Sequence, residues 1–268
     1  MIGDVVGEPG LLVLETCLPQ LIKEHSIDLT VVNGENSADG YGINDTGLYR
    51  ILSAGADVVS SGNHVWEKRD FWAFLDTEQR ILRPANYPAR VGSVNTPGKG
   101  WICLNKTVPE NSRTISALVI NLQGREFMNA IDCPFRCFDS IREATPGETP
   151  VVVVDFHAES TREKEALAYY LDGRASLVGG THTHVQTADE RILPGGTAYI
   201  TDLGMTGITR SVIGMEPQVC LERAGRHILY RMVLAGTGES KHNAEAVVQG
   251  LIAEIDCETG KAVSVRRI

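Results

Sequence analysis

Short runs of β-branched and other apolar residues alternate along most of the chain with longer segments in which apolar residues recur at helical spacing. The β-rich runs predict strands at 29–33, 57–60, 116–122, 151–156, 175–178 and 198–201. The amphipathic segments predict helices at 11–25, 45–54, 68–75 and 161–171. Strands that alternate with helices are typical of a layered α/β fold.

The pattern changes after residue 226. Three apolar segments at 226–235, 245–256 and 261–267, separated by glycine-containing turns, predict an antiparallel meander near the C-terminus. Residues 84–99 are rich in Pro, Gly and Asn, so we expect a long surface loop or a small cap within 76–100. No repeat or linker interrupts the chain, and we expect one domain over residues 1–268.

Charge and composition limit the kinds of partner that the protein is expected to bind. The chain has 268 residues, 43% of them hydrophobic, and a formal net charge of −9. This balance is typical of a globular protein, and the lack of surplus Lys and Arg disfavours stable binding of duplex nucleic acid. The longest apolar run, 166–171, is far below the about 20 residues that span a bilayer. We therefore expect no membrane partner and a cytoplasmic location.

Candidate chemistry gathers where predicted strands end. His157 follows the run at 151–156, and His182 and His184 follow the run at 175–178. The carboxyl ends of strands in α/β sheets are where ligands collect, and residues two apart in an extended segment point the same way. An isolated His-x-His pair is often accidental, so it indicates a metal site only when further ligand residues lie near it.

The first half of the chain repeats this arrangement with glycine-led polar groups. They are Gly3-Asp4, Gly34-Glu35-Asn36 and Gly62-Asn63-His64. One such group is usually a turn or a helix cap, whereas five strand ends that all carry Asp, Glu, Asn or His are hard to explain as caps.

The residue types of this set favour a metal centre. Imidazole, carboxylate and amide ligands without thiolate suit Fe or Mn best, with Zn as a further option. The ligands are too many for one tetrahedral ion, and two ions about 3.5–4 Å apart would use them all. Only Asp4 and Glu35 among them are anionic. Two divalent or trivalent cations would therefore leave a positive centre that attracts a phosphate ester.

These groups resemble the dinuclear pattern of the calcineurin-like metallophosphoesterase superfamily. The matching segments are Gly3-Asp4-Val5-Val6-Gly7, Gly34-Glu35-Asn36, Gly62-Asn63-His64, Asp155-Phe156-His157-Ala158-Glu159 and Gly180-Thr181-His182-Thr183-His184. Further segments resemble the bacterial YmdB-like branch over nearly the whole chain. They include Arg83-Pro84-Ala85-Asn86-Tyr87-Pro88, Asn121-Leu122-Gln123-Gly124-Arg125 and Asp202-Leu203-Gly204-Met205-Thr206-Gly207.

The resemblance implies a four-layer α-β-β-α sandwich and a phosphodiesterase for small cyclic nucleotides such as 2′,3′-cAMP. By analogy with the branch it also implies a homo-oligomer. Two departures from the wider superfamily fit this branch: Val6 stands where most members carry a second histidine ligand, and Glu35 replaces the usual bridging aspartate. Asn36 can supply the missing ligand through its amide oxygen.

The same resemblance implies a role for each site residue. Asp4, Asn36 and His184 would hold one ion, and Asn63, His157 and His182 the other, with Glu35 between them. A hydroxide on the metals would attack phosphorus, and His64 would donate a proton to the leaving alkoxide. A carboxylate, Asp155 or Glu159, is expected to orient His157, although Glu159 fits a helix cap equally well.

The first predicted ligand lies unusually near the start of the sequence. Only Met1, Ile2 and Gly3 precede Asp4, whereas the branch has a full apolar strand there. Either residues are missing upstream or the sheet tolerates a short strand. We favour missing residues, and then expect weaker metal binding than in a chain extended upstream.

Two other functions are compatible with parts of this pattern. A metal-dependent amidohydrolase also uses a His-x-His pair, but typically on its first strand, whereas here the pair begins at residue 182. A regulatory or nucleotide-sensing protein could keep the metal site with little turnover. His64 favours the enzyme, since a sensor does not need a proton donor.

Overall fold

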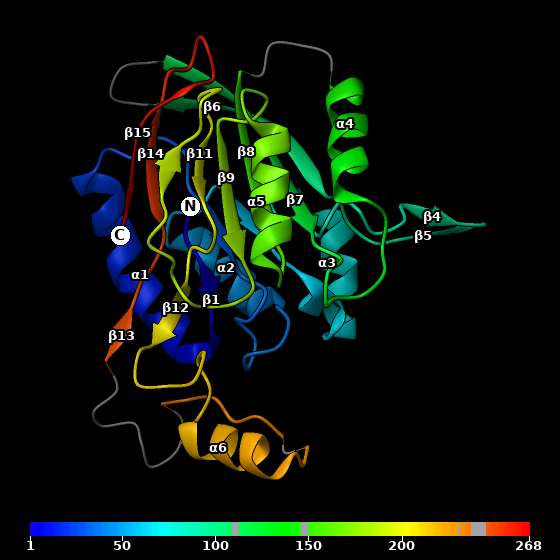
Figure 1. The fold of residues 1–268 in the computed structure, drawn as a ribbon, viewed down its shortest axis with the longest axis vertical. Coiled ribbons are helices and arrows are strands. Elements are labelled where there is room, and N and C mark those ends of the chain that lie inside the picture. The colour runs from blue at the N-terminus through cyan, green and yellow to red at the C-terminus, as the bar shows by residue number, and fades with distance from the viewer. Residues whose placement is uncertain (109–112, 146–149, 230, 237–244) are drawn as a thin grey trace.

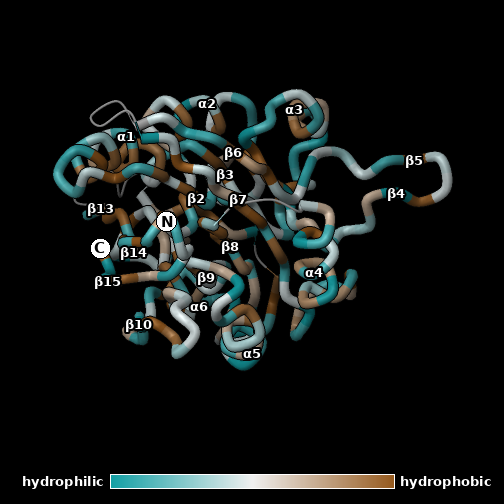
Figure 2. The backbone as a smooth tube through the Cα atoms, turned by 90° about the horizontal axis from the view of Figure 1, so that it is seen from above, coloured by the Kyte–Doolittle hydropathy of each residue, from teal (hydrophilic) through white to brown (hydrophobic). Residues whose placement is uncertain are grey.

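Two β-sheets pack face to face, and helices cover the outer face of each. The computed structural model describes residues 1–108, 113–145, 150–229, 231–236 and 245–268. Figure 2 shows α1 (Gly7–Glu24), α2 (Asp45–Ser53) and α3 (Trp72–Thr77) on one side of the strands. On the opposite side lie α4 (Pro134–Ala144) and α5 (Thr161–Leu171). The four layers expected from the family resemblance are therefore present.

The larger sheet has six strands in the order β10 (Arg191–Ile192), β11 (Ala198–Ile200), β9 (Leu177–Thr181), β8 (Val151–His157), β7 (Arg113–Gln123) and β6 (Trp101–Val108). Its four central strands are parallel, and the two edge strands pair antiparallel. The register places Gln123, His157 and Thr181 side by side at the carboxyl ends of β7, β8 and β9.

The smaller sheet is built from very short strands. Parallel pairs join β1 (Asp4–Val5) to β12 (Met205–Ile208) and β2 (Val31–Asn33) to β3 (Val58–Ser60). Antiparallel to β12 runs β13 (Ala246–Val247). Bridges from Ile2 to Val32 and Gly250 connect these pieces, so the first residues already lie within the sheet. Asp4 thus stands at a strand end although its strand has only two residues.

Three hydrophobic clusters lie between the four layers. Alternation along the strands creates them, because successive side chains point to opposite faces. On β8, Val151 and Val153 join the cluster between the sheets, whereas Val152 and Val154 pack under α4 and α5. On β2 and β3, the residues facing the larger sheet are Val31 and Val58, and those facing α1 and α2 are Val32 and Val59.

The strongest sequence patterns are confirmed. All six predicted strands occur, as β2, β3, β7, β8, β9 and β11, with ends shifted by a few residues. The predicted helix at 161–171 has the bounds of α5, and α1 and α2 match 11–25 and 45–54 closely. The segment 68–75 is divided between the 3-10 turn η2 (Arg69–Phe71) and α3.

The predicted meander is only partly correct. An antiparallel hairpin is formed by β14 (Leu251–Ile255) and β15 (Ala262–Arg267), whereas β13 pairs with β12 instead. The strand predicted at 226–235 is wrong in its described residues. Helix α6 (Pro217–Arg226) ends there, because His227 adopts a left-handed backbone with φ of 54°. Leu234 forms an isolated bridge to Met215 and belongs to no strand. Residue 230 of this prediction lies outside the described residues.

The segment at 84–99 contains a hairpin of β4 (Arg90–Val91) and β5 (Val94–Asn95). It projects from the body of the protein (Figure 1). Val91 and Val94 in this hairpin are largely exposed. The interpretation of the chain as one domain stays a prediction. No helix among the described residues is long and apolar enough to cross a membrane.

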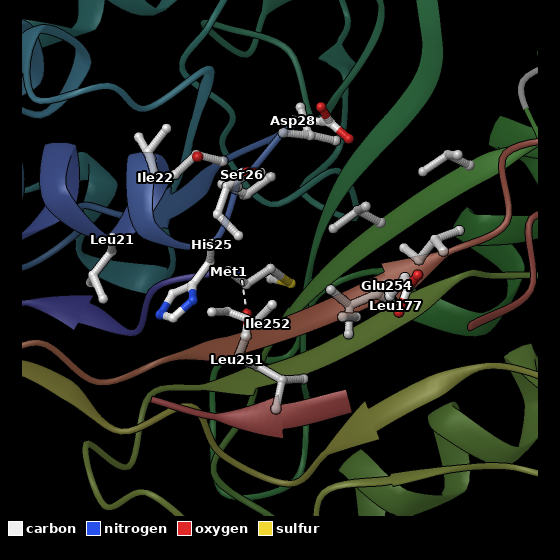
Figure 3. A pocket seen from close by; sticks show the side chains of 18 of the residues that line it. Met1, Leu21, Ile22, His25, Ser26, Asp28, Leu177, Leu251, Ile252 and Glu254 are labelled. Atoms are coloured by element: carbon white, nitrogen blue, oxygen red, sulfur yellow. Dashed lines mark hydrogen bonds between the residues drawn. The ribbon is translucent and has the colours of Figure 1, made fainter. Parts of the chain in front are cut away.

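A cavity of about 520 Å³ opens between the sheets near the amino ends of β8 and β9. Its walls include Val151, Leu177 and Leu251, and the amino group of Met1 donates a hydrogen bond to Leu251 O at its edge (Figure 3). The strand ends that carry the predicted ligands point the other way, so this cavity is separate from the candidate site.

Candidate metal centre

All eight residues singled out in the sequence lie on or next to strands, and all except Asp4 end a strand or follow one. Asp4 is in β1, Glu35 and Asn36 follow β2, and His157 ends β8. The remaining residues begin the 3-10 turn η1 (Asn63–Trp66) after β3 or follow β9 directly, and they are Asn63, His64, His182 and His184. Parallel strands bring these ends to one edge of the sandwich.

Glu35, His157 and His182 form the centre of the site. Their ligand atoms all lie within 4.8 Å of one another. The His157 Nε2 atom is 2.9 Å from Glu35 Oε1 and 3.0 Å from His182 Nδ1. Such a group of one carboxylate and two imidazoles can hold a metal ion such as Fe, Mn or Zn.

Asp4 lies between this group and the imidazole of His184. Its Oδ1 atom lies 3.8 Å from His157 Nδ1 and 3.9 Å from His184 Nε2. Its Oδ2 atom accepts a hydrogen bond from the backbone N–H of His182 at 3.2 Å. Asp4 and His157 are both completely buried.

Glu35 and His157 form a buried acid–base pair. Burial opposes the charge on Glu35, but the attraction and hydrogen bond from His157 outweigh it and lower the pKa of Glu35 to about 2. Burial also opposes the charge on His157, yet the carboxylates of Glu35 and Asp4 raise its pKa to about 9. Burial, followed by the charge of His157, lowers the pKa of His182 to about 3.

Three buried oxygens at the site lack a hydrogen-bond partner among the described residues. They are Asp4 Oδ1, Asn36 Oδ1 and Asn63 Oδ1. Their residues come from three separate segments, yet each was predicted from the sequence as a ligand. Buried polar atoms are rarely left unsatisfied, and carboxylate and amide oxygens are suitable metal ligands. The side chains present therefore fit a metal centre.

Gly62 allows η1 to approach the centre closely. A Cβ atom at this position would lie 2.2 Å from the His157 ring and 2.3 Å from Glu35 Oε2. This close approach brings the backbone of η1 to the centre, where the His64 N–H donates a hydrogen bond to Glu35 Oε2 at 3.2 Å. The His64 ring lies at the rim, where it contacts Glu67 Oε1 at 3.3 Å and packs edge-on against Tyr41.

The group that orients the His157 ring is a hydroxyl, and not the carboxylate expected from the sequence. His157 Nδ1 contacts Thr181 Oγ1 at 3.0 Å, and the Thr181 hydroxyl donates to Asp155 Oδ1 at 2.7 Å. Asp155 thus acts on His157 through Thr181 and not directly. Glu159 contacts His182 Nε2 at 3.2 Å, while Ser160 caps α5. Sequence reasoning missed Thr181, because its role depends on the register between β8 and β9.

The His-x-His turn has an unusual backbone. His182 and His184 have φ angles of 98° and 63°, a region that residues other than glycine rarely adopt. Asp202 stabilises the turn, since its Oδ2 accepts from the Thr183 N–H at 3.2 Å and from the Thr183 hydroxyl at 2.7 Å.

A buried lysine completes this support. Lys164 Nζ lies 2.7 Å from Asp202 Oδ2, and both side chains are almost fully buried. The sequence analysis used Asp202 only within the family resemblance and did not identify Lys164. Nothing in the spacing of these two residues indicates that they meet, because α5 and the loop before β12 come together only in the fold.

The four-layer fold and this edge of carboxylate, imidazole and amide groups define a metallophosphoesterase-like protein. The whole chain, residues 1–268, matches the YmdB-like protein family. The chain therefore belongs to that family, as its motifs predicted. This membership implies divalent metal ions as cofactors and an enzyme of the metal-dependent phosphoesterase class.

Individual relatives match the chain over its full length. One is the 2′,3′-cyclic-nucleotide 2′-phosphodiesterase of Bacillus subtilis, 41% identical over 267 residues, covering 100% of this chain and 94% of that protein. Another is a putative phosphatase/phosphodiesterase of Mycoplasma pneumoniae, 32% identical over 276 residues, covering 100% of this chain and 90% of that protein.

A solved structure from Thermus thermophilus, described as a hypothetical protein, is 39% identical with a TM-score of 0.84. It is matched over 96% of its length and 100% of this chain. The structure of a novel phosphatase from Mycoplasma pneumoniae has a TM-score of 0.86 at 29% identity. That match covers 90% of the phosphatase and 100% of this chain, which confirms the fold.

Proposed function

We propose that the chain is a dinuclear-metal phosphodiesterase that hydrolyses small cyclic nucleotides such as 2′,3′-cAMP. The observation that carries this proposal is the convergence of three partnerless oxygens, on Asp4, Asn36 and Asn63, around the cluster of Glu35, His157 and His182. The name of the Bacillus subtilis relative supports the substrate class.

The ligands divide into two sets in this proposal. Asp4, Asn36 and His184 hold one ion, Asn63, His157 and His182 hold the other, and Glu35 lies between them. The nearness of His157 to both His182 and Glu35 supports the second set, whereas Asp4 lies about equally near His184 and His157. We propose Fe or Mn as the resident metals because no thiolate belongs to the set.

The metals, when bound, would supply a hydroxide nucleophile near neutral pH and positive charge beside the phosphoryl group. The chain contributes binding and orientation. Asp4 and Glu35 are the only anionic ligands, so the site accepts a phosphodiester although the whole protein carries a charge of −9. Thr181 and Asp202 hold the ring of His157 and the His-x-His turn in place.

His64 is the proposed proton donor to the leaving alkoxide. Its side chain is 25% exposed, which leaves the ring accessible to a substrate at the rim. Its backbone is tied to Glu35 and its Nδ1 atom contacts Glu67. This arrangement orients the ring so that Nε2 remains available for proton transfer.

The experiment is an assay of metal-loaded protein with 2′,3′-cAMP, together with Glu35→Gln and His64→Ala. Hydrolysis by the wild type and its loss in both variants is the expected result. Binding of the nucleotide without any turnover would overturn the proposed phosphodiesterase activity and favour a nucleotide-sensing protein. Metal analysis of protein purified without added metal tests the choice of Fe or Mn.

A further inference from the structure

A group of polar side chains next to the candidate metal centre has buried atoms that bind nothing. They are Trp66 Nε1, the Tyr87 hydroxyl and both amide atoms of Gln123, and none has a hydrogen-bond partner in the described part of the chain. An unsatisfied buried polar atom destabilises the folded state, so native proteins contain few of them. Their concentration in one place is typical of a buried polar site that a ligand completes.

These side chains belong to three segments that meet beside His157. Gln123 lies in register with His157 across β7 and β8, and the next residue, Gly124, donates its N–H to His157 O at 2.9 Å. Trp66 ends the same 3-10 turn that begins with Asn63 and His64. The rings of Trp66 and Tyr87 pack edge to face with centroids 5.3 Å apart.

The Tyr87 hydroxyl lies within reach of both the group and the metal centre. Burial, the largest effect, and the charge of Glu35 raise the pKa of Tyr87, while the hydrogen-bonding groups on the side chains of Trp66, Gln123 and Asn129 lower it. None of these neighbours is oriented to complete a hydrogen bond with the hydroxyl. The hydroxyl therefore remains protonated at neutral pH and is free to donate and to accept.

The position of Gln123 is fixed by its backbone and not by its side-chain amide. Asn86 Nδ2 donates to Gln123 O at 2.8 Å, and Gln123 N–H donates to Asn86 Oδ1 at 2.9 Å. Gln123 is fully buried. The backbone that carries this amide is thus held in one place, as a preorganised binding group requires.

The donors and acceptors in this group indicate the chemistry of the ligand. Trp66 can only donate, whereas Tyr87 and Gln123 can each donate and accept. A phosphate dianion or a diester anion would satisfy donors but not the Gln123 carbonyl. That carbonyl needs a ligand with its own O–H or N–H groups, which sugars and nucleobases provide, and glutamine amides pair well with adenine.

We propose that Trp66, Tyr87 and Gln123 form a subsite for the sugar and base of a nucleotide whose phosphodiester lies at the metal centre. This inference rests on the proposed function and assigns these residues to recognition of the nucleoside. They bind the substrate, while the metal ligands and His64 act on its phosphorus.

The test compares two substrates that share a five-membered cyclic phosphodiester. One is 2′,3′-cAMP, and the other is ethylene phosphate, which has no sugar or base. The variants are Tyr87→Phe and Gln123→Met, each of which removes polar atoms with little change in volume. Thr30→Val is the matched control, because Thr30 Oγ1 is also buried without a partner but lines the cavity at the opposite strand ends.

We expect each variant to lower kcat/KM for 2′,3′-cAMP by about three- to tenfold, as loss of an uncharged hydrogen bond does. Ethylene phosphate hydrolysis, metal content and the control should stay unchanged. The melting temperature should stay constant or rise, since an unsatisfied buried atom is removed. Equal losses for both substrates, a lower melting temperature with loss of metal, or no loss for the nucleotide would each overturn the inference.

A binding experiment separates this inference from the proposed function. Calorimetry compares adenosine 3′-monophosphate with inorganic phosphate on the metal-loaded protein. If the wild type hydrolyses neither cyclic diester but binds the nucleotide more tightly, and both variants lose that preference, the subsite stands and the phosphodiesterase fails. If the wild type hydrolyses both diesters and the variants do so equally well, the phosphodiesterase stands and the subsite fails.

Discussion

The two ends of the strands in this sandwich have opposite characters. At the carboxyl ends, buried oxygens lack partners, two histidines adopt a rare backbone conformation, and a carboxylate and an imidazole form an ion pair. At the amino ends, a cavity of about 520 Å³ lies between mainly aliphatic walls. The partnerless Thr30 Oγ1 and the left-handed backbone of Ser26 also border this cavity, so one such feature alone does not indicate a site. The carboxyl ends differ because several unsatisfied oxygens and strained residues lie there beside a buried ion pair.

Among the changes at the two ends, loss of the Glu35 carboxylate should lower the activity most. We expect Glu35→Gln to lower the phosphodiesterase activity at least about 10³-fold, because it removes both the bridging charge and the partner of His157. Steady-state kinetics with metal-loaded protein measures it. Glu254→Gln, at the cavity, is the control and should stay within about twofold of the wild type. A Glu35→Gln protein that keeps a tenth of the activity would contradict the proposed bridge.

A smaller loss is expected from His64→Ala, about 10²-fold with 2′,3′-cAMP, as is typical for a general acid. The effect should nearly vanish with a nitrophenyl phosphodiester, whose leaving group needs no proton. Comparing the two substrates therefore separates proton donation from binding. If the variant lost the same factor with both, His64 would serve another purpose.

The ion pair of Glu35 and His157 predicts that the thermal stability depends on pH in protein stripped of metal with EDTA. The pKa of His157 is raised from 6.5 to about 9, so the stabilisation from its charge is complete below pH 6.5 and is lost as the pH rises through 9. We expect the melting temperature to fall by several degrees more between pH 7 and 9 in the wild type than in His157→Gln. Parallel pH profiles for the two proteins would argue against the pair.

The smallest effect is expected at the amino ends. Ala253 lines the cavity there, and Ala253→Leu should fill part of it and stabilise the protein by about 1 kcal/mol, with unchanged kcat/KM. Thermal denaturation and the same kinetic assay measure the two quantities. A change in catalysis would show that the two ends are coupled.

Sequence patterns were reliable where burial and periodicity agree. The runs at 151–156 and 161–171 became β8 and α5 because both are packed in the core. The apolar residues of 226–235 suggested a strand, yet Ile228 and Leu229 are 52% and 85% exposed, so apolar character alone did not predict their structure.

The candidate ligands could be identified from sequence because all except Asp4 end a strand or follow one, and parallel strands end at one edge. Thr181, Lys164 and Asp202 could not, since their contacts join elements that are distant along the chain. The polar atoms of Trp66, Tyr87 and Gln123 were missed for a different reason. Whether a buried group has a partner is visible only when all of its neighbours are in place.

The buried pair of Lys164 and Asp202 has a consequence for how fast metal is captured. It holds the turn of His182 and His184 through Thr183 by contacts within the chain alone. In the proposed metal centre, the two imidazoles would not have to be brought together by the ion. Uptake by the folded protein is therefore expected to follow the rate at which the ion loses its water, without a slow rearrangement of the polypeptide.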